Sequence, residues 1–163
     1  MNALFVLGGA VVIDSGGASF LAAAMLRRFE GLRLAPYLCP AGKPTIGYGH
    51  VILPGEAYLR AGVTVEQAEM LLLHDLAWAL YAARDVGRVL TDGQAAALAS
   101  LVYNIGARGW ATSTLRGMVI AGDMVGAANQ FIRWNKVRGV PNAGLTARRW
   151  REKQVFEGVA WTG

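Results

Sequence analysis

Glu30 is the acidic residue whose surroundings best suit proton-transfer chemistry. It ends an apolar helical run, and a glycine follows it directly. The C-terminal end of a helix disfavours an anion, and the flanking Phe29 and Leu32 would remove water from the carboxyl group. Both effects favour the protonated form that a general acid needs near neutral pH. Arg27, Arg28 and Arg33, if they pointed toward the carboxyl group, would instead favour its ionised form.

The other acidic residues have simpler structural interpretations. Four lie on a predicted long helix, where we expect solvated or first-turn charges. Two stand at predicted helix starts, and two lie among Arg and Lys on the last predicted helix. One falls in a loop and one in the apolar N-terminal run. These residues are, in the same order, Glu66, Glu69, Asp75 and Asp85; Asp92 and Asp123; Glu152 and Glu157; Glu56; Asp14.

Cys39 and Thr45 follow Glu30 in the pattern E-x8-C-x5-T, and "TIGYGH" begins at the threonine. This pattern resembles phage-type lysozymes (glycoside hydrolase family 24, the phage endolysins), which place Glu, then Asp or Cys, then Thr at this spacing. The resemblance covers residues 18–158. Its most specific part is "LRRFEGLRLAPYLCPAGKPTIGYGHV", and "SLVYNIG", "STLR", "FIRWN" and "GLTARRWREKQVF" follow in the family's order.

The resemblance implies a muramidase that hydrolyses the β-1,4 bond between N-acetylmuramic acid and N-acetylglucosamine in peptidoglycan. Glu30 would protonate the leaving glycosidic oxygen. Cys39 stands where many relatives carry an Asp that, with a Thr, holds the attacking water. A thiol with a pKa of about 8.5 needs a nearby cation, such as Lys43 or an arginine, to become a thiolate.

Two chemistries remain open for Cys39: it activates water, or it attacks the sugar directly. We favour water activation, and therefore inversion at the anomeric carbon. Thr45 would orient that water through its hydroxyl. The structural alternative for Cys39 is a small buried apolar residue, and the alternative for Thr45 is a β-branched strand residue without a catalytic role.

Substrate-binding residues are expected on both sides of the cleft that this fold implies. Gly47 and Gly49 would let a sugar chain approach the strand backbone closely. Tyr48 would present a ring and a hydroxyl to a saccharide, with core packing as the alternative. Tyr103 and Asn104 match the family's cleft-facing segment on the other lobe.

Several further residues are expected to support this site. His50 is interpreted as a structural hydrogen-bonding or salt-bridge residue. Arg148 or Arg149 is predicted to reach back toward Glu30 and tune its acidity. The tryptophans, including Trp134 and Trp150, are expected in the core.

The elements that must position these residues can be predicted from periodicity and caps. Ser19 would cap a helix to Glu30 whose apolar side includes Phe20, and residues 36–53 read as a hairpin or three-stranded sheet. Capping boxes open helices at 64–84 and at 91–106, the second ended by Gly106. Further helices are expected at 113–121, 124–135 and 146–157, with caps at Asp123 and Thr146. The fold class is therefore α+β and mostly helical: a lysozyme-like fold with a small β lobe and a helical lobe joined by a long helix.

Composition limits the partners and the chemistry. Sixteen Lys and Arg face eleven Asp and Glu, and this net charge of +5 favours a polyanionic partner. The resemblance selects peptidoglycan glycan strands, without nucleic acid, cofactor or metal, and we expect a monomer. The single cysteine cannot form an internal disulfide, and His50 and His74 lack the spacing of a zinc site.

The N-terminal residues 1–17 are predicted to form a separate apolar segment, before a catalytic domain at 18–163. The run at 3–13 is too short for a bilayer span and lacks the preceding positive charges of a signal peptide. It either packs on the domain or forms a weak anchor, so transient inner-membrane contact through residues 1–26 remains open. We expect the protein in the host cytoplasm until lysis, acting on the cell wall in the periplasm, or tethered to the membrane before release.

Two other functions are compatible with parts of the sequence. A basic chain with an apolar N-terminus could permeabilise membranes or bind the wall without hydrolysing it. Nucleic-acid binding through residues 133–151 is a weaker variant. A lytic transglycosylase would act on the same bond with one acidic residue, but would leave a 1,6-anhydro sugar. The ordered Glu–Cys–Thr spacing favours the hydrolase.

Overall fold

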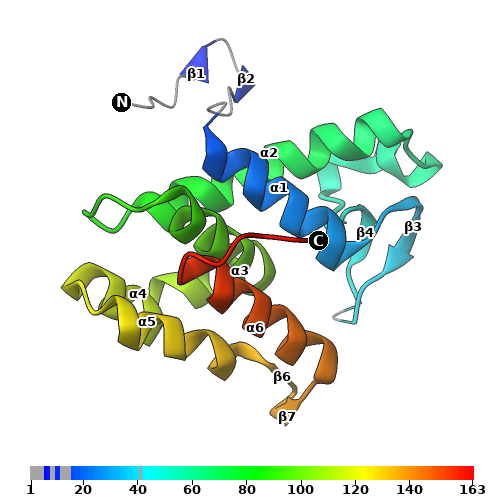
Figure 1. Cartoon of the computed structure of the whole chain (residues 1–163). Coiled ribbons are helices and arrows are strands. Elements are labelled where there is room, and N and C mark those ends of the chain that lie inside the picture. Colours follow the sequence, from blue (N-terminus) through cyan, green and yellow to red (C-terminus); the bar gives the residue numbers. More distant parts are fainter. Residues whose placement is uncertain (1–5, 8–9, 12–15, 41) are drawn as a thin grey trace.

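A computed structural model describes residues 6–7, 10–11, 16–40 and 42–163. It shows a small β lobe and a larger helical lobe, with the long helix α2 running between them (Figure 1). The elements, in chain order, are β1 (Val6–Leu7), β2 (Ala10–Val11), α1 (Gly17–Glu30), β3 (Arg33–Leu38), β4 (Pro44–Gly47), β5 (His50–Val51), the 3-10 helix η1 (Pro54–Ala61), α2 (Val65–Arg84), α3 (Asp92–Ala111), α4 (Thr114–Ala121), α5 (Met124–Gln130), the 3-10 helix η2 (Phe131–Trp134), β6 (Lys136–Val137), β7 (Val140–Pro141) and α6 (Ala143–Phe156).

The β lobe is an antiparallel sheet in the order β3-β4-β5, which confirms the sheet predicted for residues 36–53. Its register places Tyr37 opposite Thr45, and Ile46 opposite His50. Alternation along β4 directs Ile46 into a small core of its own with Ile52 and Leu59. The sheet therefore fixes Thr45 and Tyr37 side by side at one edge of the lobe.

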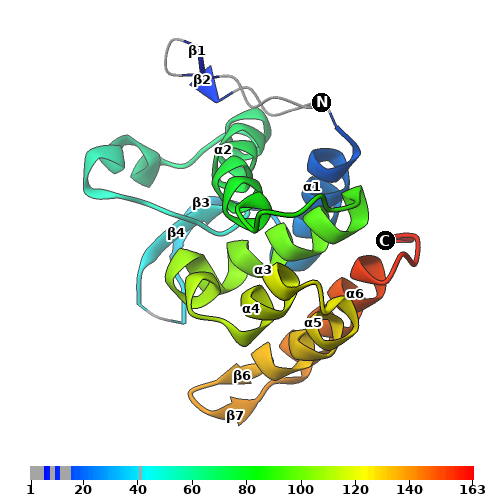
Figure 2. The same cartoon turned by 90° about the vertical axis from the view of Figure 1, so that its left-hand side faces the viewer.

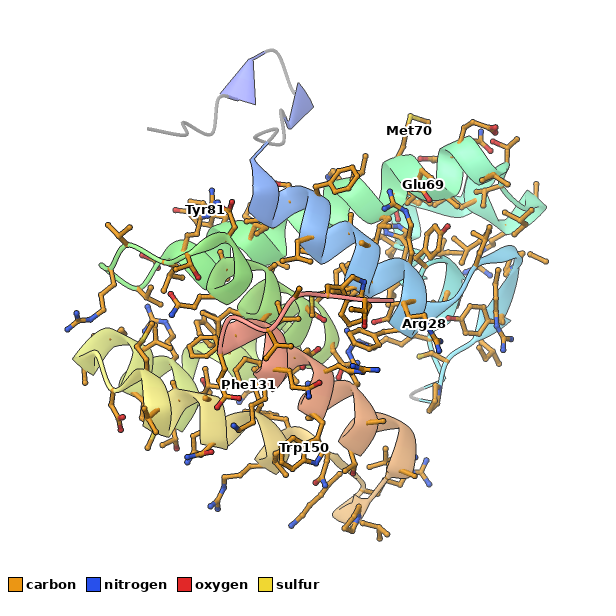
Figure 3. The ribbon with its side chains drawn as sticks, in the orientation of Figure 1. Arg28, Glu69, Met70, Tyr81, Phe131 and Trp150 are labelled. Atoms are coloured by element: carbon orange, nitrogen blue, oxygen red, sulfur yellow. The ribbon has the colours of Figure 1, made fainter. Side chains whose placement is uncertain are left out.

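The helical lobe is built around α3, which packs against α1, α2 and α6 (Figure 2). Eight consecutive residues of α3, from Ala95 to Val102, are buried, and small side chains among them let the other helices approach closely. Phe131 and Phe156 close the far side of this core with ring centroids 5.4 Å apart (Figure 3). The predicted mostly helical α+β class is confirmed.

The starts of α2 and α3 confirm the two predicted capping boxes. The side chain of Thr64 accepts a hydrogen bond from the Gln67 N–H, and the Gln67 side chain accepts one from the Thr64 N–H. Thr91 and Gln94 repeat this exchange at α3. These reciprocal bonds satisfy donors that would otherwise be unpaired at the first turn.

The start of α1 differs from the prediction. The helix begins at Gly17, so Ser19 is not its cap but a buried residue of its first turn. A side chain at Gly17 would clash with Asp92, and this glycine therefore lets α1 begin directly against α3. Phe20 is exposed rather than apolar core, because the buried face follows Ala18, Ala22 and neighbouring residues instead.

Three later boundaries also differ. The cap of α6 is Asn142, whose side chain accepts from the Leu145 N–H, so Thr146 lies inside the helix. Gly106 has a φ of 77° and kinks α3, but helical structure resumes and continues to Ala111. The predicted helix at 124–135 is divided into α5 and η2, while η1 and the β6–β7 hairpin were not predicted.

The N-terminal segment is described only at its two short strands. β1 and β2 pair antiparallel, Val6 with Val11. Most of the predicted apolar run, including Asp14, lies outside the described residues. Within the residues that the structure does describe, no helix combines the length and apolarity needed to cross a bilayer.

Candidate active site

Glu30 occupies the last position of α1, at the junction of the two lobes. Gly31 follows with a φ of 68°, a conformation that turns the chain sharply into β3. The Glu30 side chain is 19% exposed, and its Oε1 accepts a hydrogen bond of 2.6 Å from Nη1 of Arg148. Its Oε2 faces Gly49, where an added Cβ would lie 3.4 Å away. The two carboxylate oxygens therefore have different surroundings, one cationic and one beside a bare backbone.

Arg148 is held by a buried network that ends on α6 and α3. Its Nε donates to Glu152 at 3.0 Å, and its Nη2 donates to the Ser100 carbonyl at 3.1 Å. Glu152 is fully buried and also accepts from the Ser100 hydroxyl at 2.7 Å. Burial lowers the pKa of Arg148, but the charges of Glu152 and Glu30 outweigh it and raise that pKa above its usual value.

Arg149 does not take part in this contact with Glu30. It is fully buried and forms its ion pair with Glu152 instead, at 2.9 Å. Burial is the main cause that lowers the pKa of Arg149 to about 10. The predicted reach toward Glu30 is therefore made by Arg148. Glu152, expected to be structural, is the shared anion of both arginines.

Cys39 begins the turn that joins β3 to β4. Its N–H donates to the Lys43 carbonyl at 3.0 Å, and its carbonyl accepts from the Gly42 N–H at 2.8 Å. The residue is partly exposed, so its thiol is not sealed within the sheet. Thr45 is 2% exposed, and its hydroxyl also donates to the Lys43 carbonyl, at 2.9 Å. This donation leaves the lone pairs of the Thr45 oxygen as possible acceptors.

Tyr37 is a further residue of this part of the β lobe, and sequence reasoning did not identify it. It lies directly opposite Thr45 in the sheet, and its ring stacks under the Arg33 guanidinium at 4.6 Å. Burial is the main cause that raises the pKa of Tyr37; Arg33 opposes the rise, and charge on Glu30 and on Cys39 adds to it. Tyr37 is therefore a partly desolvated phenol beside Thr45 in the sheet.

Two residues of the "IGYGH" segment have roles different from those predicted. Gly47 is buried against α2, where an added Cβ would meet Ala68 at 3.5 Å, so it accommodates a helix rather than a sugar. Tyr48 is 7% exposed, and its hydroxyl donates to Glu69 at 2.9 Å. Its ring therefore takes the core-packing alternative. Glu69 also pairs with Arg27 of α1, so it is not the solvated charge that was expected (Figure 3).

A cavity of about 380 Å³ lies between the lobes, walled by β5, α2 and α3. Gly49 forms its boundary on the Glu30 side, and Tyr103 lines it from α3. The Tyr103 hydroxyl donates to the Tyr48 carbonyl at 2.8 Å and thereby links the lobes. Burial is the main cause that raises the pKa of Tyr103 well above its ordinary range.

Asn104 and the tryptophans complete the comparison with the sequence. Asn104 is exposed and does not line this cavity. Trp78 of α2 does line it, with two thirds of its surface exposed, so the prediction that it lies in the core was wrong. Trp134 packs against the core as predicted. Trp150 is half exposed on α6, so the prediction that it lies in the core was wrong (Figure 3).

His50 joins the β lobe to α2 through two carboxylates. Its Nδ1 lies 2.8 Å from Asp75 Oδ2, and its Nε2 lies 3.0 Å from Glu56 Oε2. The hydrogen bond to Asp75 is the main cause that raises the pKa of His50 from 6.5 to about 9. His50 is thus a charged structural residue, and Asp75 is its partner rather than a solvated charge.

This ion pair predicts a pH-dependent stability. Because the folded pKa exceeds the unfolded one, the stabilisation is complete below about pH 6.5 and is lost as the pH rises through about 9. At about pH 6 we expect His50→Asn to lower the free energy of unfolding by about 2 kcal/mol, after allowance for screening of the two partly exposed carboxylates. At about pH 10 the difference from wild type should nearly vanish.

Denaturant unfolding of both proteins at the two pH values measures this difference. His74→Asn is the matched control, since His74 contacts the same Asp75 from an exposed position and should show little change. A His50→Asn difference that stays constant from pH 6 to pH 10 would contradict a charged native His50.

Comparisons with known proteins agree with this geometry. The phage lysozyme family model matches residues 27–152, which include Glu30, Cys39, Thr45 and Arg148. The chain belongs to the phage lysozyme family. It is 40% identical over 140 residues to the endolysin of Acyrthosiphon pisum secondary endosymbiont phage 1, covering 82% of this chain and 92% of the relative.

Further matches lead to the same conclusion. The SAR-endolysin of Bacteriophage PS119 is 34% identical over 154 residues, 86% of this chain and 87% of the relative. The solved endolysin from Escherichia coli O157:H7 phage FAHEc1 superposes with a TM-score of 0.73 at 32% identity, covering 88% of this chain and 94% of that one. The protein is accordingly a lysozyme of the endolysin class: a muramidase that hydrolyses the β-1,4 glycosidic bond of bacterial peptidoglycan.

Proposed function

We propose that Glu30 is the general acid of this muramidase, and that Cys39 and Thr45 activate the attacking water. The observation that carries this assignment is the unequal environment of the Glu30 carboxyl group. Oε1 is bound by the Arg148 cation at 2.6 Å, so a proton on the carboxyl group resides on Oε2. Oε2 faces Gly49, which borders the cavity between the lobes. The proton is thereby presented toward the side where a glycan would lie.

Cys39 and Thr45 supply the opposite half of the reaction in this proposal. Departure of the protonated oxygen leaves an oxocarbenium-like sugar that water must attack. Cys39 lies beside Thr45 at the β3–β4 turn, where its N–H and the Thr45 hydroxyl both donate to the Lys43 carbonyl. A thiolate there accepts a proton from water, while the Thr45 oxygen accepts a second hydrogen bond from it. The product would have inverted configuration.

Glycan binding is proposed along the cavity between the lobes. Gly49 keeps the backbone beside Glu30 free of a side chain, and Tyr103 offers a ring face from α3. Asn104 is exposed next to Tyr103 and would bind sugar substituents outside the cavity. Apolar walls with a few polar groups are typical of saccharide and small-molecule sites. The proposed partner is one peptidoglycan strand, and the proposed bound form is a monomer without nucleic acid.

The experiment that tests the assignment of Glu30 is digestion of purified peptidoglycan by wild type and by Glu30→Gln. Only the wild type should reduce the turbidity of the wall suspension. Mass spectrometry of the released fragments should show hydrated reducing ends rather than 1,6-anhydro ends, because water is the acceptor in this mechanism.

We also propose that the protein remains on the cytoplasmic side of the host membrane until lysis, with transient membrane contact through the segment before α1. The predicted contact through residues 1–26 is too long, because residues 17–26 belong to α1 and Ala22, Met25 and Leu26 are buried in the core. The apolar run at 3–13 supports the contact. Arg27 and Arg28, in the last turn of α1, would favour a cytoplasmic position for the rest of the chain. Such a contact is weaker than a span, since the run is shorter than a bilayer requires.

Membrane fractionation of cells that make the full chain, or a chain without residues 1–17, tests this contact. We expect a substantial membrane-bound fraction for the full chain, released by high salt or alkaline carbonate, and a loss of that fraction after truncation. Equal distribution of the two proteins would contradict the role given to the N-terminal segment.

A further inference from the structure

The segment after α6 returns to the last turn of α1 (Figure 1), the helix that ends at Glu30. Trp161 in this segment is partly buried and packs on Phe29 edge to face, with ring centroids 5.4 Å apart and an interplanar angle of 75°. Both rings join the border of the main core. Trp161 lies beyond residues 27–152, which match the family model, so the family assignment does not account for this contact.

Phe29 in turn supports the cation that binds Glu30. The guanidinium carbon of Arg148 lies 4.9 Å from the centre of the Phe29 ring, within the range of a cation–π contact. The same guanidinium donates to Glu30 at 2.6 Å. An unbroken series of contacts therefore runs from Trp161 through Phe29 and Arg148 to the Glu30 carboxyl group.

The position of Phe29 in this series depends on Trp161 for physical reasons. Phe29 is in the last turn of α1, where little helix follows to hold its ring. On its outer side lies a cavity of about 300 Å³, lined by Trp161 together with the exposed Arg28 and Arg151. Phe29 and Arg148 line the same cavity, so loss of the indole would widen it, remove the ring that holds Phe29 in place and expose more of the guanidinium to water.

Arg148 has a competing anion that makes its placement sensitive. Its Nε is bound to Glu152, which is fully buried and cannot move toward Glu30 without losing Ser100 and Arg149. If the Phe29 ring shifts, Arg148 can keep its Nε bond to Glu152 while the planar guanidinium rotates, so that Nη2 leaves the Ser100 carbonyl and Nη1 leaves Glu30 together. The direction of the Glu30 carboxyl group is then no longer fixed.

We propose that Trp161 is a positioning residue: it fixes Phe29 against Arg148 and thereby holds the Glu30 carboxyl group in its reactive orientation. This inference rests on the proposed role of Glu30 as the general acid. It concerns the rate of bond cleavage, because none of Trp161, Phe29 and Arg148 lines the cavity proposed to bind the glycan.

Steady-state kinetics on soluble peptidoglycan fragments test this inference with three variants of one position. Trp161→Ala should lower kcat by about three- to tenfold, the range expected from loss of one aromatic contact, with KM unchanged within about twofold. Trp161→Phe keeps an edge-to-face ring and should restore most of kcat. Trp161→Leu fills the volume without a ring and should remain low. Trp150→Ala is the matched control, since Trp150 is exposed on α6 and contacts Lys153.

Thermal unfolding of each variant, with kinetics measured well below its melting temperature, separates misfolding from misplacement. If the Ala variant is unfolded at the assay temperature, the comparison of kcat between the Phe and Leu variants tests the proposal. Equal kcat values for Phe and Leu, or a change confined to KM, would overturn the proposal. Activity retained by Glu30→Gln would instead overturn the role of Glu30, whatever Trp161 does, so the two failures are distinguishable.

Discussion

Glu30→Gln is expected to lower kcat on peptidoglycan by about a thousandfold, within the range that loss of a general acid produces. Glutamine keeps the size of the side chain and can still accept a hydrogen bond from Arg148 through its amide oxygen. It cannot release a proton to the glycosidic oxygen. Because binding surfaces are unchanged, KM should stay within about threefold, so the loss appears in kcat.

The change also removes one of four charges in the buried network. Glu30 and Glu152 balance Arg148 and Arg149, and the variant leaves one cation in excess. Some loss of stability is therefore expected, and the melting temperature must be measured beside the rate. Glu157→Gln is the matched control, because Glu157 is exposed and pairs with Lys153 away from this network. A Glu30→Gln enzyme that retains more than about a tenth of wild-type kcat would show that another group donates the proton.

Short-range features of this protein could be predicted from the sequence because their causes are local. The capping boxes at Thr64 and Thr91 involve partners three residues apart, and both formed as expected. The hairpin between Cys39 and Thr45 follows from turn residues between two β-branched or aromatic segments. Three of the residues proposed for the site are therefore close in the chain and could be recognised together.

The contacts that complete the site could be predicted only in part, because they join distant residues. Glu30 and Arg148 are 118 positions apart, and the sequence offered two adjacent arginines as candidates. Adjacent residues on a helix point about 100° apart, so a choice between Arg148 and Arg149 requires the orientation of α6. The burial of Glu152 could not be predicted for the same reason. A helix rich in charged residues is expected to be solvated unless its packing is known.

Errors on the strand and helix faces have a different cause. Gly47 and Gly49 share one strand-and-turn segment, but only Gly49 reaches Glu30, while Gly47 meets α2. Both are compatible with the same sequence pattern, and the packing of α2 decides between them. Phe20 was assigned to the apolar side of its helix from periodicity, and Trp150 to the core from its residue type. A large apolar residue on the surface is common, so its type carries less information than its place on the helix.

Cys39→Ala, or alkylation of Cys39 with iodoacetamide, is expected to lower kcat by about a hundredfold or more while the fold is retained. Alanine leaves no group to accept a proton from water, and the alkylated sulfur cannot form a thiolate. Alkylation is specific because the chain has one cysteine. Far-ultraviolet circular dichroism and the melting temperature of the modified protein check that the partly exposed hairpin tip tolerates the change.

A carboxylate at the same position should distinguish the two chemistries left open for Cys39. Cys39→Asp places a carboxylate base at the position of the thiol, and if Cys39 activates water this variant should retain at least about a tenth of wild-type kcat. Proton NMR of the first product should then show the inverted α-anomer for both enzymes. A β-anomer from the wild type would mean that the thiol attacks the sugar directly and that a covalent intermediate forms. Full activity of the alanine variant would exclude both chemistries, since neither can proceed without the sulfur.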